Sequence, residues 1–247
     1  MKVEVAFRAE DAGAPDPDGV AVVIDVLRAT TWVAIALERG AWGIRPVLEV
    51  DEARELARSL RQAGEPVLLA GERGGLPPEG FDLGNSPAEL LETDLRDRRL
   101  VLTTTNGTRT LQRVAGSGRI LVASLRNAGA TARYLAALDR PVYLVCAGTR
   151  GRISQEDVLA AGWIVRHLRA LAVEVALSDG ARVAEAAALA WEGRELEALQ
   201  EAAHGQTLLE LGFARDLAMA AERDVWPGVV ALDGGWLRRV EDEAART

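Results

Sequence analysis

Short apolar runs alternate with amphipathic stretches along most of this chain. A continuous apolar run of four or five residues indicates a strand buried on both faces, as in a parallel sheet. The predicted strands are Val3–Phe7, Val20–Ile24, Ile44–Val47, Val67–Ala70, Arg99–Leu102, Ile120–Ala123, Val142–Val145 and Val229–Leu232. Helical spacing predicts helices over Thr30–Arg39, Asp51–Ala63, Thr108–Val114, Asn127–Leu138 and Ser154–Arg169, then a mostly helical region over Ala172–Ala221 and a charged tail to Thr247.

Capping residues define several of the predicted helix starts. Asp51 and Ser154 are residue types whose side chains accept the free N–H groups of a first turn. Ser86 is followed by Pro87 and Glu89, which predicts a further helix with proline at its first position.

Strands that alternate with helices at the spacing of βαβ units predict an α/β fold. We expect a mostly parallel sheet with helices on both faces. Two α/β subdomains with the site between them fit the same pattern. The best boundary is the loop near Ser124–Gly129, which gives an N-terminal α/β half over residues 1–125 and a helix-rich C-terminal α/β half over residues 126–247. A single domain is the alternative.

The central stretch of the chain follows the run Arg99–Leu102, which ends in three threonines and an Asn-Gly pair. Asn-Gly is typical of a hairpin, but the residues after it do not alternate with period two. A strand that leads into a helix is therefore the better interpretation. Free N–H groups and the helix dipole favour an anion at such a turn. We expect it to bind a negatively charged group through Thr105, Asn106, Gly107 and Thr108.

Composition and charge restrict the partners. The chain has 247 residues, a net charge of −8 and a pI near 5.0, so nucleic acid is not expected to bind. Cys146 is the only cysteine, which excludes an internal disulfide and fits a reducing compartment. Neither a signal peptide nor an apolar run of membrane-spanning length is visible. We expect a cytoplasmic protein without membrane association, and a homodimer is the assembly considered.

Polar clusters follow several of the predicted strands. Because ligands of α/β sheets bind outside the carboxyl ends of the strands, clusters in these positions indicate a site. They begin at Asp25, Gly71, Thr103, Ser124 and Cys146. Each residue alone also has a structural interpretation: a carboxylate can cap a helix, and an arginine can form a surface ion pair.

These clusters belong to motifs that resemble those of the 2-phosphosulfolactate phosphatase family. The motifs are Asp25-Val26-Leu27-Arg28-Ala29-Thr30-Thr31, Gly71-Glu72-Arg73, Gly80-Phe81-Asp82-Leu83-Gly84-Asn85-Ser86-Pro87, Thr104-Thr105-Asn106-Gly107-Thr108, Cys146-Ala147-Gly148, Glu156-Asp157, and the ending His204-Gly205, Leu209, Gly212 and Asp216. The resemblance covers nearly the whole chain in the right order. It implies a site in a cleft and magnesium-dependent hydrolysis of (R)-2-phospho-3-sulfolactate to 3-sulfolactate and phosphate, a step of coenzyme M biosynthesis.

The residue types in these motifs suit that chemistry. Magnesium takes oxygen ligands, usually one or two carboxylates and water, so the metal candidates are Asp25, Glu72, Asp82, Glu156 and Asp157. The catalytic candidates are Asp25, Glu72 and Asp82, with Asp25 first as ligand or base. Arginine pairs with anionic oxygens in bidentate fashion, and the candidates for binding the small anionic phosphoester are Arg28, Arg73, Asn85, Ser86, Thr105, Asn106, Gly107, Thr108, Ser124, Asn127 and Gly148. His204 is either an acid or a structural residue.

Rival interpretations remain open from the residues alone. Cys146 and Arg152 have the spacing of a cysteine phosphatase loop, in which a thiolate attacks phosphorus. Asp25 could be phosphorylated itself, although Leu27 stands where that class has a second aspartate. A non-enzymatic anion-binding module is a further alternative, but it would gain nothing from clustered carboxylates. The substrate could also be another small 2-phospho-hydroxyacid.

Overall fold

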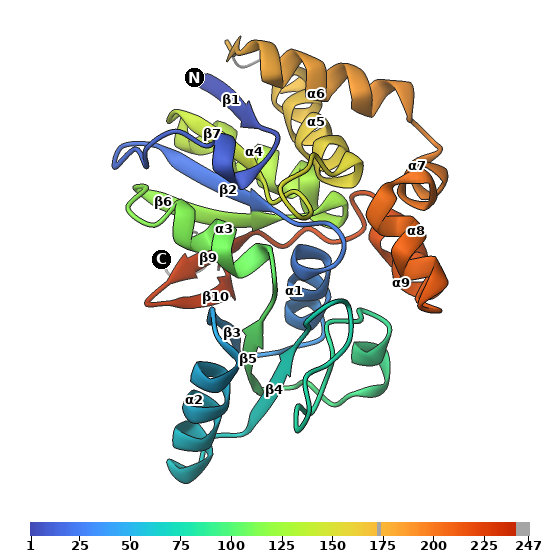
Figure 1. Ribbon diagram of the computed structural model, residues 1–247. Coiled ribbons are helices and arrows are strands. Elements are labelled where there is room, and N and C mark those ends of the chain that lie inside the picture. Colours follow the sequence, from blue (N-terminus) through green and yellow to red (C-terminus); the bar gives the residue numbers. More distant parts are fainter. Residues whose placement is uncertain (172–173, 241–247) are drawn as a thin grey trace.

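The computed structural model describes residues 1–171 and 174–240, and Figure 1 shows how their elements are arranged. The strands are β1 (Lys2–Ala6), β2 (Val20–Ile24), β3 (Gly43–Pro46), β4 (Val67–Gly71), β5 (Arg99–Thr103), β6 (Arg119–Ala123), β7 (Val142–Cys146), β8 (Ala176–Leu177), β9 (Val230–Asp233) and β10 (Trp236–Arg239). The α-helices are α1 (Ala29–Glu38), α2 (Val50–Gln62), α3 (Gly107–Arg113), α4 (Ala128–Leu138), α5 (Gln155–Ala170), α6 (Asp179–Ala190), α7 (Glu195–Glu201), α8 (Ala203–Glu210) and α9 (Ala214–Ala221).

All of these strands belong to one sheet, in the order β4-β5-β3-β10-β9-β6-β2-β7-β1-β8. The strands β4, β5 and β3 form one parallel set, and β6, β2, β7, β1 and β8 form another. The antiparallel hairpin β9–β10 joins the two sets, pairing with β6 on one side and β3 on the other. The prediction of a mostly parallel α/β fold is confirmed. The boundary between residues 125 and 126 stays a prediction.

Helices cover both faces of the larger parallel set, as β2 shows. Val20, Val22 and Ile24 point into the apolar cluster that contains α4 and α5. The alternate residues Ala21 and Val23 point into the cluster that contains α1 and the apolar side of α3. Because both faces are buried, every residue of this strand is apolar, which is why the run could be recognised in the sequence.

Several local predictions were wrong. No helix starts at Ser86, and that segment forms only a short 3₁₀ helix at Glu89–Glu92. Asp51 does not cap α2, because the helix begins one residue earlier and Glu49 precedes it. The strands β8 and β10 were not predicted, and β8 lies inside the region expected to be helical. The charged tail lies outside the described residues. None of the described helices is long and apolar enough to cross a membrane.

Candidate active site

Asp25 stands one residue beyond β2, at the carboxyl end of this strand, and is only 6% exposed. Its carboxylate accepts the backbone N–H groups of Ala29 and Gly107, which open α1 and α3. Burial raises the pKa of Asp25 to about 7, and the charges of Glu72 and Glu156 add to the rise. A Cβ atom at position 107 would lie 3.0 Å from Asp25 Oδ2, so this close approach requires glycine. Asp25 is therefore held between two helix starts with two other carboxylates close by.

The first turn of α5 supplies Glu156 and Asp157, and both side chains are buried. Asp157 accepts the N–H of Val26 at 2.8 Å and of Gly148 at 3.1 Å, one at each carboxylate oxygen. It thus connects the loop after β2 with the loop after β7. Burial and the charges of Glu156 and Asp25 raise its pKa well above the ordinary value.

Glu156 is 1% exposed and differs from its neighbour in its contacts. Its Oε2 atom has no hydrogen-bond partner within the part of the chain that the structure describes. Burial raises the pKa of Glu156 to about 7. A buried carboxylate oxygen without a partner costs free energy, so it marks a place where a cation or a proton is required.

Glu72 follows β4 and uses both carboxylate oxygens to organise loops. Oε1 accepts the N–H of Thr105 at 2.7 Å, and Oε2 accepts the N–H of Gly75 at 2.9 Å. The first bond holds the turn between β5 and α3, and the second closes the loop of Glu72 on itself. Glu72 therefore fixes backbone at the edge of the site.

The turn between β5 and α3 has the predicted strand-to-helix form, but three of its N–H groups are engaged. Thr105 donates to Glu72, Gly107 to Asp25, and Thr108 to Thr104 Oγ1 at 3.3 Å. Asn106 precedes the helix without a side-chain capping bond. In this structure the turn holds the carboxylates of the protein, and its role toward a substrate anion stays a prediction.

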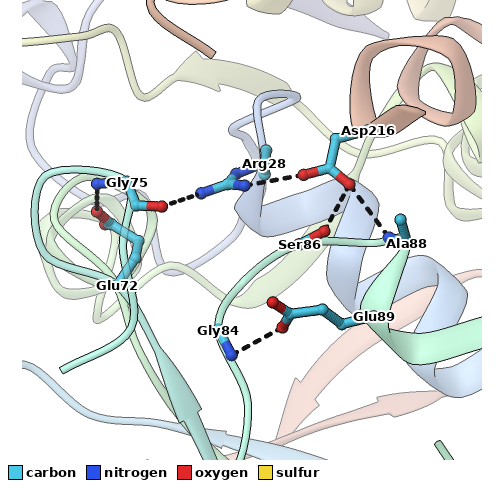
Figure 2. A network of polar contacts seen from close by, with 8 residues as sticks. All are labelled: Arg28, Glu72, Gly75, Gly84, Ser86, Ala88, Glu89 and Asp216. Atoms are coloured by element: carbon cyan, nitrogen blue, oxygen red, sulfur yellow. Dashed lines mark hydrogen bonds and ion pairs between the residues drawn. The ribbon is translucent and has the colours of Figure 1, made fainter. Parts of the chain in front are cut away.

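Arg28 is a buried arginine at the start of α1, only 3% exposed. Nη1 donates to Asp216 at 2.8 Å, Nη2 donates to the carbonyl of Gly75 at 2.7 Å, and the guanidinium lies 4.3 Å from the centre of the Phe213 ring. Figure 2 shows Arg28 between the loop of Gly75 and Asp216 of α9. Burial lowers the pKa of His204 on α8, and the positive charge of Arg28 lowers it further.

The other predicted arginine, Arg73, makes different contacts. Its Nη1 donates to the carbonyl of the preceding residue, Glu72. Its Nη2 donates to the carbonyl of Leu48 and to Thr103 Oγ1. These bonds fasten the end of β4 to β5 and to the segment after β3. Arg73 therefore stabilises the loops at the ends of these strands.

Asp82 is not brought together with the Asp25 cluster by any described contact. Its carboxylate accepts the N–H of Leu69 at 2.6 Å and pairs with Arg61 of α2 at 2.5 Å. Leu69 is the middle residue of β4, so Asp82 lies beside the strand. These bonds attach the loop after β4 to α2.

The predicted neutral contacts separate into two groups. Ser124 donates its N–H to Asn127 Oδ1 at 2.9 Å, and Asn127 donates to the carbonyl of Gly228 at 3.1 Å, so this pair joins the end of β6 to the chain before β9. Asn85 is 5% exposed, and its Oδ1 atom has no partner among the described residues. Ser86 donates its hydroxyl to Asp216 at 2.6 Å.

Asp216 was noticed in the sequence but given no role. The sequence pattern that could have revealed it is an aspartate beside apolar residues of a helix: Asp216 is buried in α9 together with Leu217 and Ala220. A buried carboxylate needs hydrogen-bond partners, so such a pattern predicts a polar network without indicating its members.

Cys146 does not have the environment of a nucleophile. It is fully buried in the cluster of α4 and α5. Burial, then the charges of Asp157 and Glu156, raise the pKa of the thiol well above its ordinary value, whereas a reactive cysteine needs a lowered one. Thr149 and Arg152 pair through their backbones in the following loop. This geometry argues against the cysteine phosphatase.

Carboxylates and a buried arginine thus lie near strand ends, where α/β sheets bind their ligands. The sequence model of the 2-phosphosulpholactate phosphatase family matches residues 7–235. Proteins named probable 2-phosphosulfolactate phosphatase are similar to the chain: one of Deinococcus radiodurans is 46% identical and covers 83% of this chain and 84% of its own length. One of Thermotoga petrophila is 41% identical and covers 87% of this chain and 89% of its own length. One of Clostridium perfringens is 36% identical and covers 98% of this chain and 97% of its own length. The chain belongs to the 2-phosphosulpholactate phosphatase family and is a phosphoric monoester hydrolase.

Proposed function

We propose that this chain hydrolyses (R)-2-phospho-3-sulfolactate to 3-sulfolactate and inorganic phosphate with magnesium, the reaction type of coenzyme M biosynthesis. Support for the substrate comes from relatives that are 36–46% identical and carry that activity in their names. Support for the metal comes from the charge balance of the site.

The charge balance is the observation that carries the proposal. The buried acidic groups at the strand ends are Asp25, Glu72, Glu156 and Asp157. The positive charge of Arg28 among them is already paired with Asp216. Burial raises the pKa of three of these acidic groups, so without a cation they hold protons, and each one that ionises would repel a substrate with phosphate, carboxylate and sulfonate groups unless a cation is bound.

The donor set fits magnesium. The Oε2 atom of Glu156 has no partner among the described residues, and Asp25 lies near enough for the charge of Glu156 to raise its pKa, so these two carboxylates would hold the ion. Within the described residues, no three His, Cys, Asp or Glu side chains form a ready ligand set. Magnesium commonly uses one or two carboxylates and keeps several waters, which this pair can provide. The ion would neutralise phosphoryl oxygens and acidify a water.

The protein's own groups then have distinct tasks. Asp25 would serve as a ligand of the ion or as the base that accepts a proton from an attacking water. Glu72 holds the turn at Thr105 in place. Arg28 still has N–H groups that can donate to an anionic group of the substrate that does not react.

The test is phosphate release from (R)-2-phospho-3-sulfolactate by the purified protein. Activity is measured with magnesium, with excess chelator, and after magnesium is added back. We expect release only when magnesium is present. Full activity under chelation would refute the metal, and release from other 2-phospho-hydroxyacids but not from this compound would refute the substrate.

A further inference from the structure

Asp216 is the residue at which three separate segments meet. It is fully buried on α9, and its Oδ1 accepts the hydroxyl of Ser86 at 2.6 Å and the N–H of Ala88 at 3.1 Å. Its Oδ2 pairs with Arg28 Nη1 at 2.8 Å. Figure 2 shows these bonds converging on one carboxylate. The C-terminal helices are thereby joined both to the start of α1 and to the loop before the 3₁₀ helix.

Arg28 is consequently held on several sides. Besides Asp216, it donates to the carbonyl of Gly75, and its face lies over Phe213. A Cβ atom on Gly75 would lie 3.1 Å from Leu211 Cδ1, so the Gly75 loop also contacts the connection between α8 and α9. A guanidinium restrained in this way loses little further freedom when it binds an anion.

Two of the five N–H donors of Arg28 are used by Asp216 and Gly75. Among the described residues, no contact uses the other three. Gly75 accepts from Arg28 through its carbonyl and donates its N–H to Glu72 at 2.9 Å, which places the guanidinium beside Glu72 and the acidic site. Arg73, by comparison, donates to three acceptors of the protein. Of the two predicted arginines, Arg28 thus keeps more donors for a substrate, three against two.

We infer that Asp216 is a positioning residue, which fixes Arg28 to bind the sulfonate of the substrate and locks the Ser86–Ala88 segment against α9. The inference rests on the proposed function, because it deepens the assignment of that substrate. Asp216 itself does not touch the substrate. Its effect is carried by the orientation of Arg28.

The experiment compares D216N with the wild type and with E210Q, a matched carboxylate-to-amide control at an exposed position of α8. The readout is kcat/KM for (R)-2-phospho-3-sulfolactate and for 2-phospholactate, which lacks the sulfonate. A lost hydrogen bond to a charged group corresponds to about 10- to 150-fold. D216N should lower the preference for the sulfonated substrate by about that factor, and E210Q should leave it unchanged.

The double variant R28A/D216N separates positioning from general damage. If Asp216 acts through Arg28, D216N will have no further effect on substrate preference once Arg28 is alanine. Equal losses on both substrates in D216N, or an additive effect on preference in the double variant, would overturn the inference. If D216N folds poorly, D216E keeps the charge beside Arg28 but lengthens the side chain, and it should lower the preference without lowering kcat/KM for 2-phospholactate.

Hydrogen exchange tests the contact with the Ser86–Ala88 segment without turnover. The amide of Ala88 donates directly to Asp216, so it should exchange faster in D216A, which removes the acceptor, and at the wild-type rate in E210Q. An unchanged rate in D216A would contradict the inference. A wild-type protein that hydrolyses neither substrate would instead refute the proposed function, while the exchange result would still report on Asp216.

Discussion

Replacing Glu156 by glutamine should stabilise the metal-free protein while abolishing its response to magnesium. Glu156 is 1% exposed, and its Oε2 has no partner among the described residues. Glutamine keeps the shape and removes the charge that burial penalises. The same charge is what a bound cation would use.

The magnitude follows from the pKa of Glu156, which burial raises from 4.5 to about 7. Between these values the folded protein binds more protons than the unfolded chain, so the free energy of unfolding falls as the pH rises. The full loss corresponds to about 3 kcal/mol once the carboxylate is ionised in both states. With chelator, E156Q should therefore exceed the wild type in stability by up to about 3 kcal/mol at pH 8, and by much less near pH 4.5.

The assay is urea unfolding at pH 4.5 to 8 with chelator and then with magnesium, on the wild type, E156Q and the exposed control E210Q. Magnesium at about 100 times its dissociation constant should stabilise the wild type by about 2.7 kcal/mol. It should stabilise E156Q far less. Parallel pH profiles for wild type and E156Q, or equal stabilisation of both by magnesium, would refute the reasoning.

The other predictions concern single side chains of the site. Cys146→Ser should keep kcat/KM within about tenfold, since no chemical step is lost; a loss of several orders of magnitude in a folded variant would restore the cysteine mechanism. Asp25→Asn should lower kcat by about 10²-fold or more; near-normal turnover at saturating magnesium would reduce Asp25 to a helix cap. Arg28→Ala should remove most of the preference for (R)-2-phospho-3-sulfolactate over 2-phospholactate, about 10- to 150-fold, whereas Arg73→Ala should change kcat/KM for both alike. If the two variants lose both substrates equally, Arg28 does not bind the sulfonate.

The sequence allowed most of the fold to be predicted because burial on both faces makes a strand continuously apolar. Val20–Ile24 was predicted with the bounds that the structure has. Ala176–Leu177 was missed because a two-residue strand at the end of the sheet has no pattern of its own. Trp236–Arg239 was missed because it contains two arginines, although the Gly234-Gly235 pair before it is a hairpin signal.

The site was predicted only as far as its residue types and strand ends allowed. The acidic residues chosen from the motifs were Asp25, Glu72, Glu156 and Asp157. In the structure the charges of Glu72 and Glu156 raise the pKa of Asp25, and the charges of Glu156 and Asp25 raise the pKa of Asp157, so these groups are neighbours near the end of β2. Which of them keeps a free oxygen depends on backbone contacts between distant segments. The bond from Val26 to Asp157 joins residues 131 positions apart, and no local pattern encodes it.

The spacing of strands in the sequence does not explain why the carboxyl ends of β2 and β5 lie close together. Between β5 and β2 the sheet order passes through β3, β10, β9 and β6, and the pairs β3–β10, β10–β9 and β9–β6 are antiparallel. Three reversals leave β5 and β2 running in opposite senses, so in a flat sheet their carboxyl ends would lie at opposite edges. Adjacent strands twist by about 20–25°, which over these five steps gives about 100–125°. Figure 1 shows β5 crossing the direction of β2. The accumulated twist brings Gly107 against Asp25, and the hairpin β9–β10 is thus the part of the fold that turns two parallel sets toward one site.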